Sequence, residues 1–525
     1  MGGGVMRGLR LPIVILAVVL CLFTNLEKSQ AYMSFYDGDL EINGFFKEQV
    51  FIRTQAPSSQ DPYRSNDIDF WRSNMIVEGL YKLKKDGDLT VNLFGGFKYY
   101  YEKAPHFNDQ MKDAIPRHAY GDYIKPSGDD LISELYADFQ NGPLQVKVGK
   151  QIVVWGETNL KQTADVINPL DLRYGSPGTE AWEDIKLGLY MIRALYQTDL
   201  PGQLNFEVLF IPGDFEMTRL PIEGTYQGEG LTDARFNAGC DYGIAEWAFE
   251  KMRRDAPGWD LSNWELGLKV RGYTWDIDWS FFYFNTLNDA ATVSDGELKG
   301  GFGANYTQFL LEYVNNAVIA EGGGPFAPYY PNKVFSYKRY EVLGATFQTR
   351  LQDFPVSEWR LEMFYYIGEP LNRATDANSR FYDETRKDTW GFGLEGRDYY
   401  TIPYFTHNWF NDKKLVASIT FFFEEILDFD RDLVIRKGRG HRRGDSHSCD
   451  IAWSFSQQFL QAKWFAMFTG SYNPIGKWFA LPVLSYAPGD SWRWEVGYAI
   501  YGASDDWQDG LSNKDSILLR ARYEF

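Results

Sequence analysis

The sequence predicts an all-β protein, a single closed antiparallel transmembrane β-barrel of about 18 strands, with 16 as the alternative. Three observations predict it: segments that alternate apolar and polar side chains, connections that alternate short and long, and an aromatic content of 17% in 525 residues. The mean hydropathy of -0.38 is too polar for a bundle of membrane helices. A barrel exposes only alternate residues to lipid, so its average stays polar.

The first 31 residues are predicted to form a secretory signal peptide. Arg7 and Arg10 precede the apolar run 11–23, which is too short to cross a bilayer as a helix. The small residues Ser29 and Ala31 stand where a signal peptidase cleaves. We therefore expect export, a barrel over residues 32–525, and residence in the outer membrane of a Gram-negative cell.

Alternation is clearest in residues 89–101. Leu, Val, Leu, Gly, Phe, Tyr and Tyr occupy the odd positions, whereas Thr, Asn, Phe, Gly, Lys and Tyr occupy the even ones. Successive side chains of a strand point to opposite faces, so this strand has one apolar and one largely polar face. The pattern recurs at 131–139, 144–154, 204–210, 264–270, 275–283, 359–367, 415–423, 451–459 and 492–500.

The connections favour a membrane barrel over a soluble sandwich, because only the barrel has reason to alternate short periplasmic turns with long outer loops. Short connections are expected at 84–87, 141–143, 199–202, near Thr274, at 352–356 and at 488–490. Long ones are expected at 54–66, 102–130, 155–185, 214–258, 289–335, 369–388, 427–449 and 502–513. The sequence does not place the turn between 397 and 414.

The last ten residues predict the closing strand. Alternation runs through 516–525 and ends on Tyr523 and Phe525, a terminus typical of barrels recognised by the outer-membrane assembly machinery. A last strand that merely ends on an aromatic residue is the simpler interpretation. The signal peptide at the other end favours the assembly signal.

Composition and motifs argue against several other functions. The net charge of -18 disfavours a nucleic-acid partner. The five histidines lack metal-protease spacing, and no nucleophile elbow or phosphate-binding glycine loop occurs. We therefore expect no enzyme activity, no cofactor and no metal. Cys240 and Cys449 fall in non-adjacent outer loops, so we expect them not to form a disulfide.

Residues 150–221 carry a resemblance to a known family. The run Trp155-Gly156-Glu157 is followed by Ile167-Asn168-Pro169-Leu170-Asp171-Leu172-Arg173 and later by Met191-Ile192-Arg193. This segment resembles the bacterial outer-membrane proteins catalogued as domain of unknown function 1302. Members are often encoded near exporters of the resistance-nodulation-division type. The resemblance thus implies a barrel that moves hydrophobic or lipidic compounds, with an inner-membrane exporter as a partner.

The same segment predicts a loop, 155–185, that folds into the barrel. Gly156 permits a sharp departure from a strand, and Asn168-Pro169 favours a turn. The expected constriction residues are Trp155, Gly156, Glu157, Asp165, Asn168, Pro169, Asp171, Arg173, Glu183, Asp184 and Arg193. Facing charges in a pore select solutes. The alternative is that these charges pair internally and anchor a structural loop.

A second charged segment is basic. Arg436, Lys437, Arg439, Arg442 and Arg443 lie in a loop of an otherwise acidic protein and suit the phosphates of lipopolysaccharide. We prefer the simpler interpretation, a solvated loop, because charge runs are usually solvated.

The function expected from the sequence is a channel or the outer-membrane partner of an export system, embedded in outer-membrane lipid. The rival is a structural barrel, such as a sheath around an electron-carrying cytochrome. A sheath needs a wide, unobstructed interior, whereas a gated pore needs an inward loop. The sequence names neither the solute nor the direction of transport.

Overall fold

The computed structural model describes residues 33–54, 68–103, 128–160, 163–172, 180, 183–219, 255–293, 335–351, 354–374, 382–404, 408, 414–431, 433–434, 446–474, 477–502 and 515–525. The signal peptide predicted at 1–31, the basic loop with Arg436, Lys437, Arg439, Arg442 and Arg443, and both Arg173 and Cys240 lie outside these residues. Among the described helices, none has the length and apolar character needed to cross a membrane.

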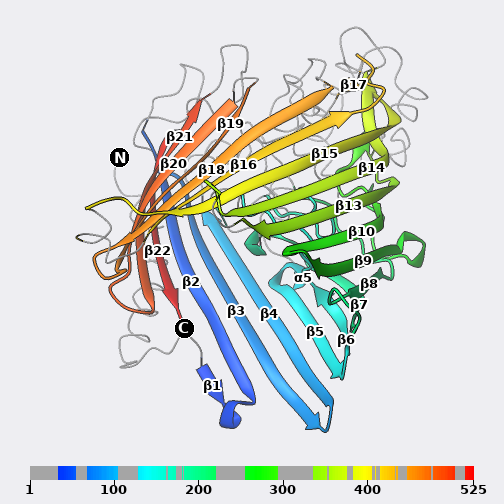
Figure 1. Cartoon of the computed structure of the whole chain (residues 1–525), viewed down its shortest axis with the longest axis horizontal. Coiled ribbons are helices and arrows are strands. Elements are labelled where there is room, and N and C mark those ends of the chain that lie inside the picture. The colour runs from blue at the N-terminus through cyan, green and yellow to red at the C-terminus, as the bar shows by residue number, and fades with distance from the viewer. Residues whose placement is uncertain are drawn as a thin grey trace, which may run out of the picture.

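Eighteen long strands form the wall (Figure 1). They are β2 (Leu40–Arg53), β3 (Ile68–Asp86), β4 (Leu89–Lys103), β5 (Ile132–Asn141), β6 (Leu144–Gln151), β7 (Leu189–Gln197), β8 (Asn205–Ile211), β9 (Glu265–Thr274), β10 (Ile277–Leu287), β13 (Arg339–Arg350), β14 (Glu358–Ala374), β15 (Tyr382–Tyr400), β16 (Leu415–Ile426), β18 (His447–Phe459), β19 (Trp464–Asn473), β20 (Lys477–Tyr486), β21 (Trp492–Gly502) and β22 (Ser516–Glu524). Minor elements are β1 (Met33–Phe35), β11 (Thr292–Val293), β12 (Phe335–Ser336), β17 (Leu433–Val434), the helical turn α5 (Gly128–Leu131) and the 3-10 turns η1 (Tyr36–Gly38), η2 (Glu183–Ile185) and η3 (Leu261–Asn263).

Antiparallel pairing closes this sheet on itself. Each wall strand pairs with the next along the chain, and β22 returns to β2 with Arg520 opposite Gln49 and Leu518 opposite Phe51. A closed sheet has no free edge, so the backbone groups of the wall are paired within it. The prediction of a closed antiparallel barrel of 18 strands is confirmed.

The predicted alternation is also present in the structure. On β4, Leu93, Phe97, Tyr99 and Tyr101 are exposed, while Lys98 and Tyr100 between them are buried. On β2, Lys47, Gln49 and Arg53 are buried along with Phe45 and Phe51. Exposed apolar side chains on one face and buried polar ones on the other are typical of a wall between lipid and a polar lumen.

The connections follow the expected rhythm with two differences, and the structure places the turn that the sequence left open. The long loop expected at 369–388 is mostly strand, because β14 extends through a bulge at Gly368 to Ala374 and pairs there with β15. The unplaced turn lies at 401–414, between β15 and β16. Cys449, expected at a loop edge, is the third residue of β18.

The C-terminal residue is held by the first wall strand. Phe525 and Gly44 exchange backbone hydrogen bonds of 3.0 and 2.9 Å. A Cβ on Gly44 would lie 2.3 Å from the carbonyl oxygen of Ile76, so only glycine fits there. The ring of Tyr523 packs against Trp492 at 4.9 Å. The closing strand is therefore built as predicted, and its role as an assembly signal stays a prediction.

Candidate functional site

The connection between β6 and β7, residues 152–188, is the candidate site, and we call it the lumen loop. Near its beginning lies Trp155, whose side chain is 1% exposed. The indole packs on Phe282 and Phe284, with ring centroids at 5.1 and 6.0 Å, and donates to Glu207 at 3.1 Å. A Cβ on Gly267 of β9 would lie 2.7 Å from this indole, so a glycine is needed there to leave room for the ring.

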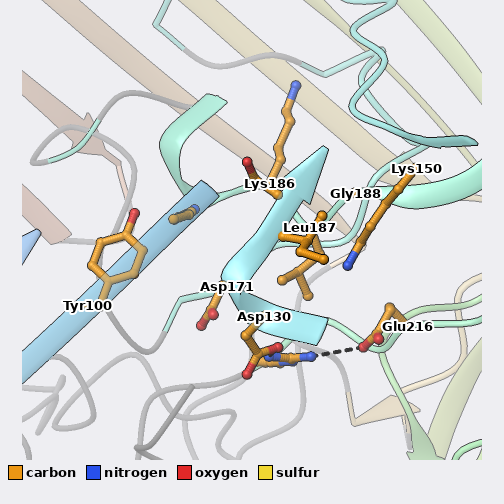
Figure 2. A pocket seen from close by; sticks show the side chains of 12 residues that line it. Tyr100, Asp130, Lys150, Asp171, Lys186, Leu187, Gly188 and Glu216 are labelled. Atoms are coloured by element: carbon orange, nitrogen blue, oxygen red, sulfur yellow. Dashed lines mark hydrogen bonds and ion pairs between the residues drawn. The ribbon is translucent and has the colours of Figure 1, made fainter. Parts of the chain in front are cut away.

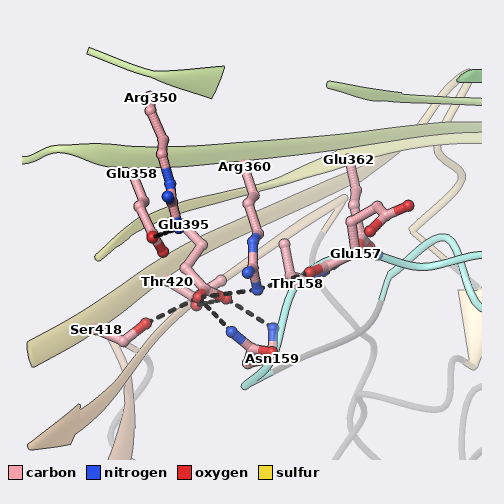
Figure 3. A network of polar contacts seen from close by, with 10 residues as sticks. All are labelled: Glu157, Thr158, Asn159, Arg350, Glu358, Arg360, Glu362, Glu395, Ser418 and Thr420. Atoms are coloured by element: carbon pink, nitrogen blue, oxygen red, sulfur yellow. Dashed lines mark hydrogen bonds and ion pairs between the residues drawn. The ribbon is translucent and has the colours of Figure 1, made fainter. Parts of the chain in front are cut away.

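The outgoing limb of the lumen loop is fixed by one carboxylate. Glu362 of β14 is fully buried, and its two oxygens accept hydrogen bonds from backbone and hydroxyl donors of the loop, of which Figure 3 shows those of Glu157 and Thr158. Donors from Thr158, Thr163 and Ala164 reach it at 2.9, 2.8 and 2.9 Å, and the backbone N–H of Glu157 also donates. A buried charge is tolerated here because several dipoles solvate it in place of water.

A second carboxylate holds the tip of the same limb. Glu395 of β15 accepts from the backbone and side-chain nitrogens of Asn159 at 2.7 and 2.9 Å. Ser418 of β16 donates to it at 2.9 Å. Arg360 bridges the two parts, since its guanidinium donates to the Glu157 carbonyl at 3.1 Å and lies 3.8 Å from Glu395 (Figure 3).

Asn168 organises the middle of the lumen loop. Its side-chain oxygen accepts from the N–H of Val153 at 2.7 Å, and its amide donates to the carbonyls of Gln151 and Leu187 at 3.1 and 2.8 Å. The Asn-Pro pair therefore ties both limbs of the loop to the end of β6. Pro169 adds to this by accepting from the N–H of Leu187 at 2.8 Å.

A buried ion pair joins the two limbs directly. Asp165 and Lys186 contact each other with side chains 5% and 1% exposed. Burial raises the pKa of Asp165, an effect that the Lys186 ammonium opposes. The pair therefore costs desolvation and holds the loop only while both charges are present.

The returning limb reaches a basic part of the wall. Glu180 contacts Lys47 of β2, accepts from Gln49 at 2.7 Å, and lies 3.6 Å from Arg72 of β3 and 4.0 Å from Arg520 of β22. Burial by itself raises the pKa of Glu180, but the three cations outweigh it and lower the pKa to about 2. Glu180 is therefore a carboxylate at any physiological pH.

These contacts place the lumen loop across the barrel. In the ring of eighteen wall strands β3 is second and β14 is eleventh, so they are nine positions apart in both directions. Residues 157–164 bind β14 and β15, whereas Glu180 binds β2, β3 and β22. A segment held at half a turn of the ring passes through the lumen. The predicted inward folding is thus what the structure shows.

A small cavity lies beside the returning limb. It has a volume of about 20 Å³, room for one water. Charges of both signs line it, among them Lys150, Asp171 and Lys186 (Figure 2). Lys98 lines it as well. Arg219, which follows β8 in the chain, also lines this cavity and pairs with Asp130 and, at 3.1 Å, with Glu216.

Arg173 lies outside the described residues, and the other ten predicted site residues fall into three groups. Trp155, Gly156, Glu157, Asp165, Asn168, Pro169, Asp171 and Asp184 lie in the lumen loop, and their role in a constriction stays a prediction. Arg193 does not, because it lies in β7 and pairs with Glu207 at 2.7 Å. Glu183 opens the turn η2, and its side chain lies outside what the structure describes.

Sequence reasoning missed the partners of the loop. These are Glu362, Glu395, Lys47, Arg72 and Arg520, together with Glu180 and Lys186 of the loop itself. The five wall residues stand in segments that alternate apolar and polar side chains, which is a usable signal for a polar lumen face. Which of these residues face each other across the lumen depends on how the barrel closes, and a local sequence pattern does not contain that information.

A comparison of sequences decides the family. The profile described as "Protein of unknown function (DUF1302)" matches residues 14–525. The chain belongs to this family. No curated protein matches this DUF1302 member.

Solved outer-membrane channels are similar in fold to this DUF1302 protein. OmpF of Salmonella typhi, solved with daunomycin, is 9% identical, with 94% of this chain and 100% of that chain covered and a TM-score of 0.40. OpdK of Pseudomonas aeruginosa, solved with vanillate, is 8% identical, with 93% of this chain and 98% of that chain covered and a TM-score of 0.41. OccAB3 of Acinetobacter baumannii is 10% identical, with 93% of this chain and 99% of that chain covered and a TM-score of 0.45. At such identities and scores these channels lend no support to a function.

Proposed function

We propose that this protein is a solute channel of the outer membrane whose pathway is narrowed by the lumen loop. The observation that carries the proposal is the anchoring of one loop to opposite sides of a closed ring, by Glu362 on one side and Glu180 on the other. A sheath around another protein needs a clear interior. A loop across the lumen supports the channel and argues against the sheath.

The buried charges of the wall support selectivity. Carboxylates gather on β14, β15 and β16, and cations gather on β2, β3 and β4. The two sets are Glu358, Glu362, Glu369, Glu395 and Glu424, and Lys47, Arg53, Arg72 and Lys98. Opposed sets of charge create a field across the pore that orients and sorts passing solutes.

The proposal includes the surroundings of the channel. We infer residence in the outer membrane, contact with its lipid and lipopolysaccharide, and insertion by the assembly machinery through Tyr523 and Phe525. An inner-membrane exporter as partner, and hydrophobic or lipidic cargo, rest on the family resemblance. Fractionation with the outer membrane and heat-modifiable mobility on gels test this part, and folded protein in the soluble periplasm would contradict it.

Conductance tests the channel itself. The full chain, reconstituted in planar bilayers, should give a small, charge-selective current. A variant in which a short Gly-Ser linker replaces residues 157–184 should give a larger and less selective one. Equal currents from both proteins, each checked for folding by heat-modifiable mobility, would show that the loop does not limit the pathway. No current from either would refute the channel.

A further inference from the structure

The wall of β2, β3 and β22 contains a basic cluster that the lumen loop fills with a single carboxylate. Lys47, Arg72 and Arg520 converge on Glu180, with Gln49 as an amide donor; we call these four wall residues the basic site. The side chains of Lys47, Arg72 and Glu180 are at most 4% exposed. The basic site thus brings three cations to one loop carboxylate, and Arg520 also pairs with Glu495 of β21 at 2.9 Å.

The contacts are those of a carboxylate binding site. One oxygen of Glu180 accepts from Gln49 at 2.7 Å and faces Arg72 at 3.6 Å, while the other oxygen contacts Lys47. Separate donors for the two oxygens suit a planar carboxylate better than a spherical anion. Glu180 is thus bound as a ligand would be, but it arrives on a loop.

Aromatic rings border the basic site. Lys47 lies 5.7 Å from the ring centre of Phe45, and Arg72 lies 4.7 Å from that of Phe70. Phe70 in turn stacks on Phe51, with centroids 4.5 Å apart. The cations of the basic site are therefore backed by aromatic rings, of which Phe51 and Phe70 are buried against Leu518.

We propose that the basic site binds the carboxylate of organic acids passing through the channel, and that Glu180 occupies it between solutes as a tethered competitor. This inference rests on the proposed function and names its substrate class. Exchange is chemically matched, because an incoming carboxylate takes over the contacts that Glu180 releases. The low pKa of Glu180 is consistent with this, since the residue leaves by exchange with another anion rather than by protonation at neutral pH.

Binding of benzoate to the folded, detergent-solubilised full chain tests the proposal by calorimetry. Wild-type protein should bind benzoate weakly, because Glu180 holds the site. Glu180→Gln removes the competitor and should bind at least about tenfold more tightly, since apparent affinity scales with the fraction of open sites. Benzamide, the neutral isostere, should bind neither protein.

Two variants serve as controls. Glu41→Gln removes a carboxylate from an exposed ion pair with Lys82 at 2.6 Å, far from the lumen loop, and should leave benzoate affinity unchanged. Adding Arg72→Gln or Arg520→Gln to Glu180→Gln should abolish the gain. Either double variant is sufficient, so the test still works if the other one fails to fold.

The outcomes separate this proposal from the channel itself. Equal affinity of wild type and Glu180→Gln, or equal binding of benzamide and benzoate, would overturn it. Sulfate binding Glu180→Gln as tightly as benzoate would also overturn it, as that indicates a site for anions in general. Calorimetry needs no current, so a conducting protein without benzoate binding loses only this inference.

Discussion

Glu362 and Glu180 hold the same loop from opposite sides of the barrel. Glu362 belongs to the wall and accepts hydrogen bonds from the outgoing limb. Glu180 belongs to the returning limb and binds the basic site of the wall. A carboxylate thus fixes the loop on each side of the barrel. Glu362 binds neutral N–H and O–H groups, whereas Glu180 binds cations.

Replacing Glu362 with Gln should release the outgoing limb while the barrel still assembles. The amide keeps one acceptor and gains a donor that faces N–H groups, so buried donors lose their partners at about 1–3 kcal/mol each. We expect a larger single-channel current with normal heat-modifiable mobility. Glu41→Gln is the matched control, and a current equal to wild type in both variants would contradict the anchor.

The pair of Asp165 and Lys186 should behave as a buried ion pair. Lys186→Met leaves the Asp165 charge buried alone, at a cost of about 3–5 kcal/mol in loop stability. Burial raises the pKa of Asp165 even with Lys186 present. Lowering the pH should therefore neutralise Asp165 and restore the variant. Protease resistance of the loop measures this, and Asp165→Asn with Lys186→Met should be resistant without acid.

Acid should detach the returning limb in a defined window. The pKa of Glu180 is lowered from 4.5 to about 2 on folding, so its contribution is complete above about pH 4.5 and disappears as the pH falls toward 2. Wild-type current should change across that window, whereas Glu180→Gln should show no such step. A step of equal size in both proteins would assign the titration to another group.

Gly393 of β15 should control the seat of the outgoing limb. A Cβ there would lie 3.3 Å from side-chain atoms of Thr163, so Gly393→Leu must push this turn away from Glu362. We expect a larger single-channel current, as for a released loop, from a barrel that is still folded. Gly95→Leu is a control, as a Cβ at Gly95 meets its nearest neighbour at 3.8 Å. Unchanged current in Gly393→Leu would mean that the turn adapts.

The barrel could be predicted from the sequence because its signals are local. Period-2 alternation fixes which side chain faces which side, and turn length fixes the direction of the next strand. The error at 369–388 has a local cause as well. Polar residues beyond Gly368 resemble a loop, but β14 and β15 continue pairing there above a bulge.

The partners across the lumen could not be predicted in this way. Trp155 and Asn168 stood out because glycine and proline mark a departure from the strand. Nothing near Glu362 or Arg72 distinguishes them from other polar residues that face a lumen. Their role follows from positions half a ring apart, which exist only once the sheet has closed.

The seam between β2 and β22 has a consequence for biogenesis. Arg520 donates to Gln49 at 3.1 Å across that seam, joining residues 471 positions apart in the chain. Glu180 therefore has its full set of partners only once β22, the last strand, has docked on β2. Completion of the constriction thus depends on closure of the barrel, and an unclosed barrel holds the returning limb with fewer contacts.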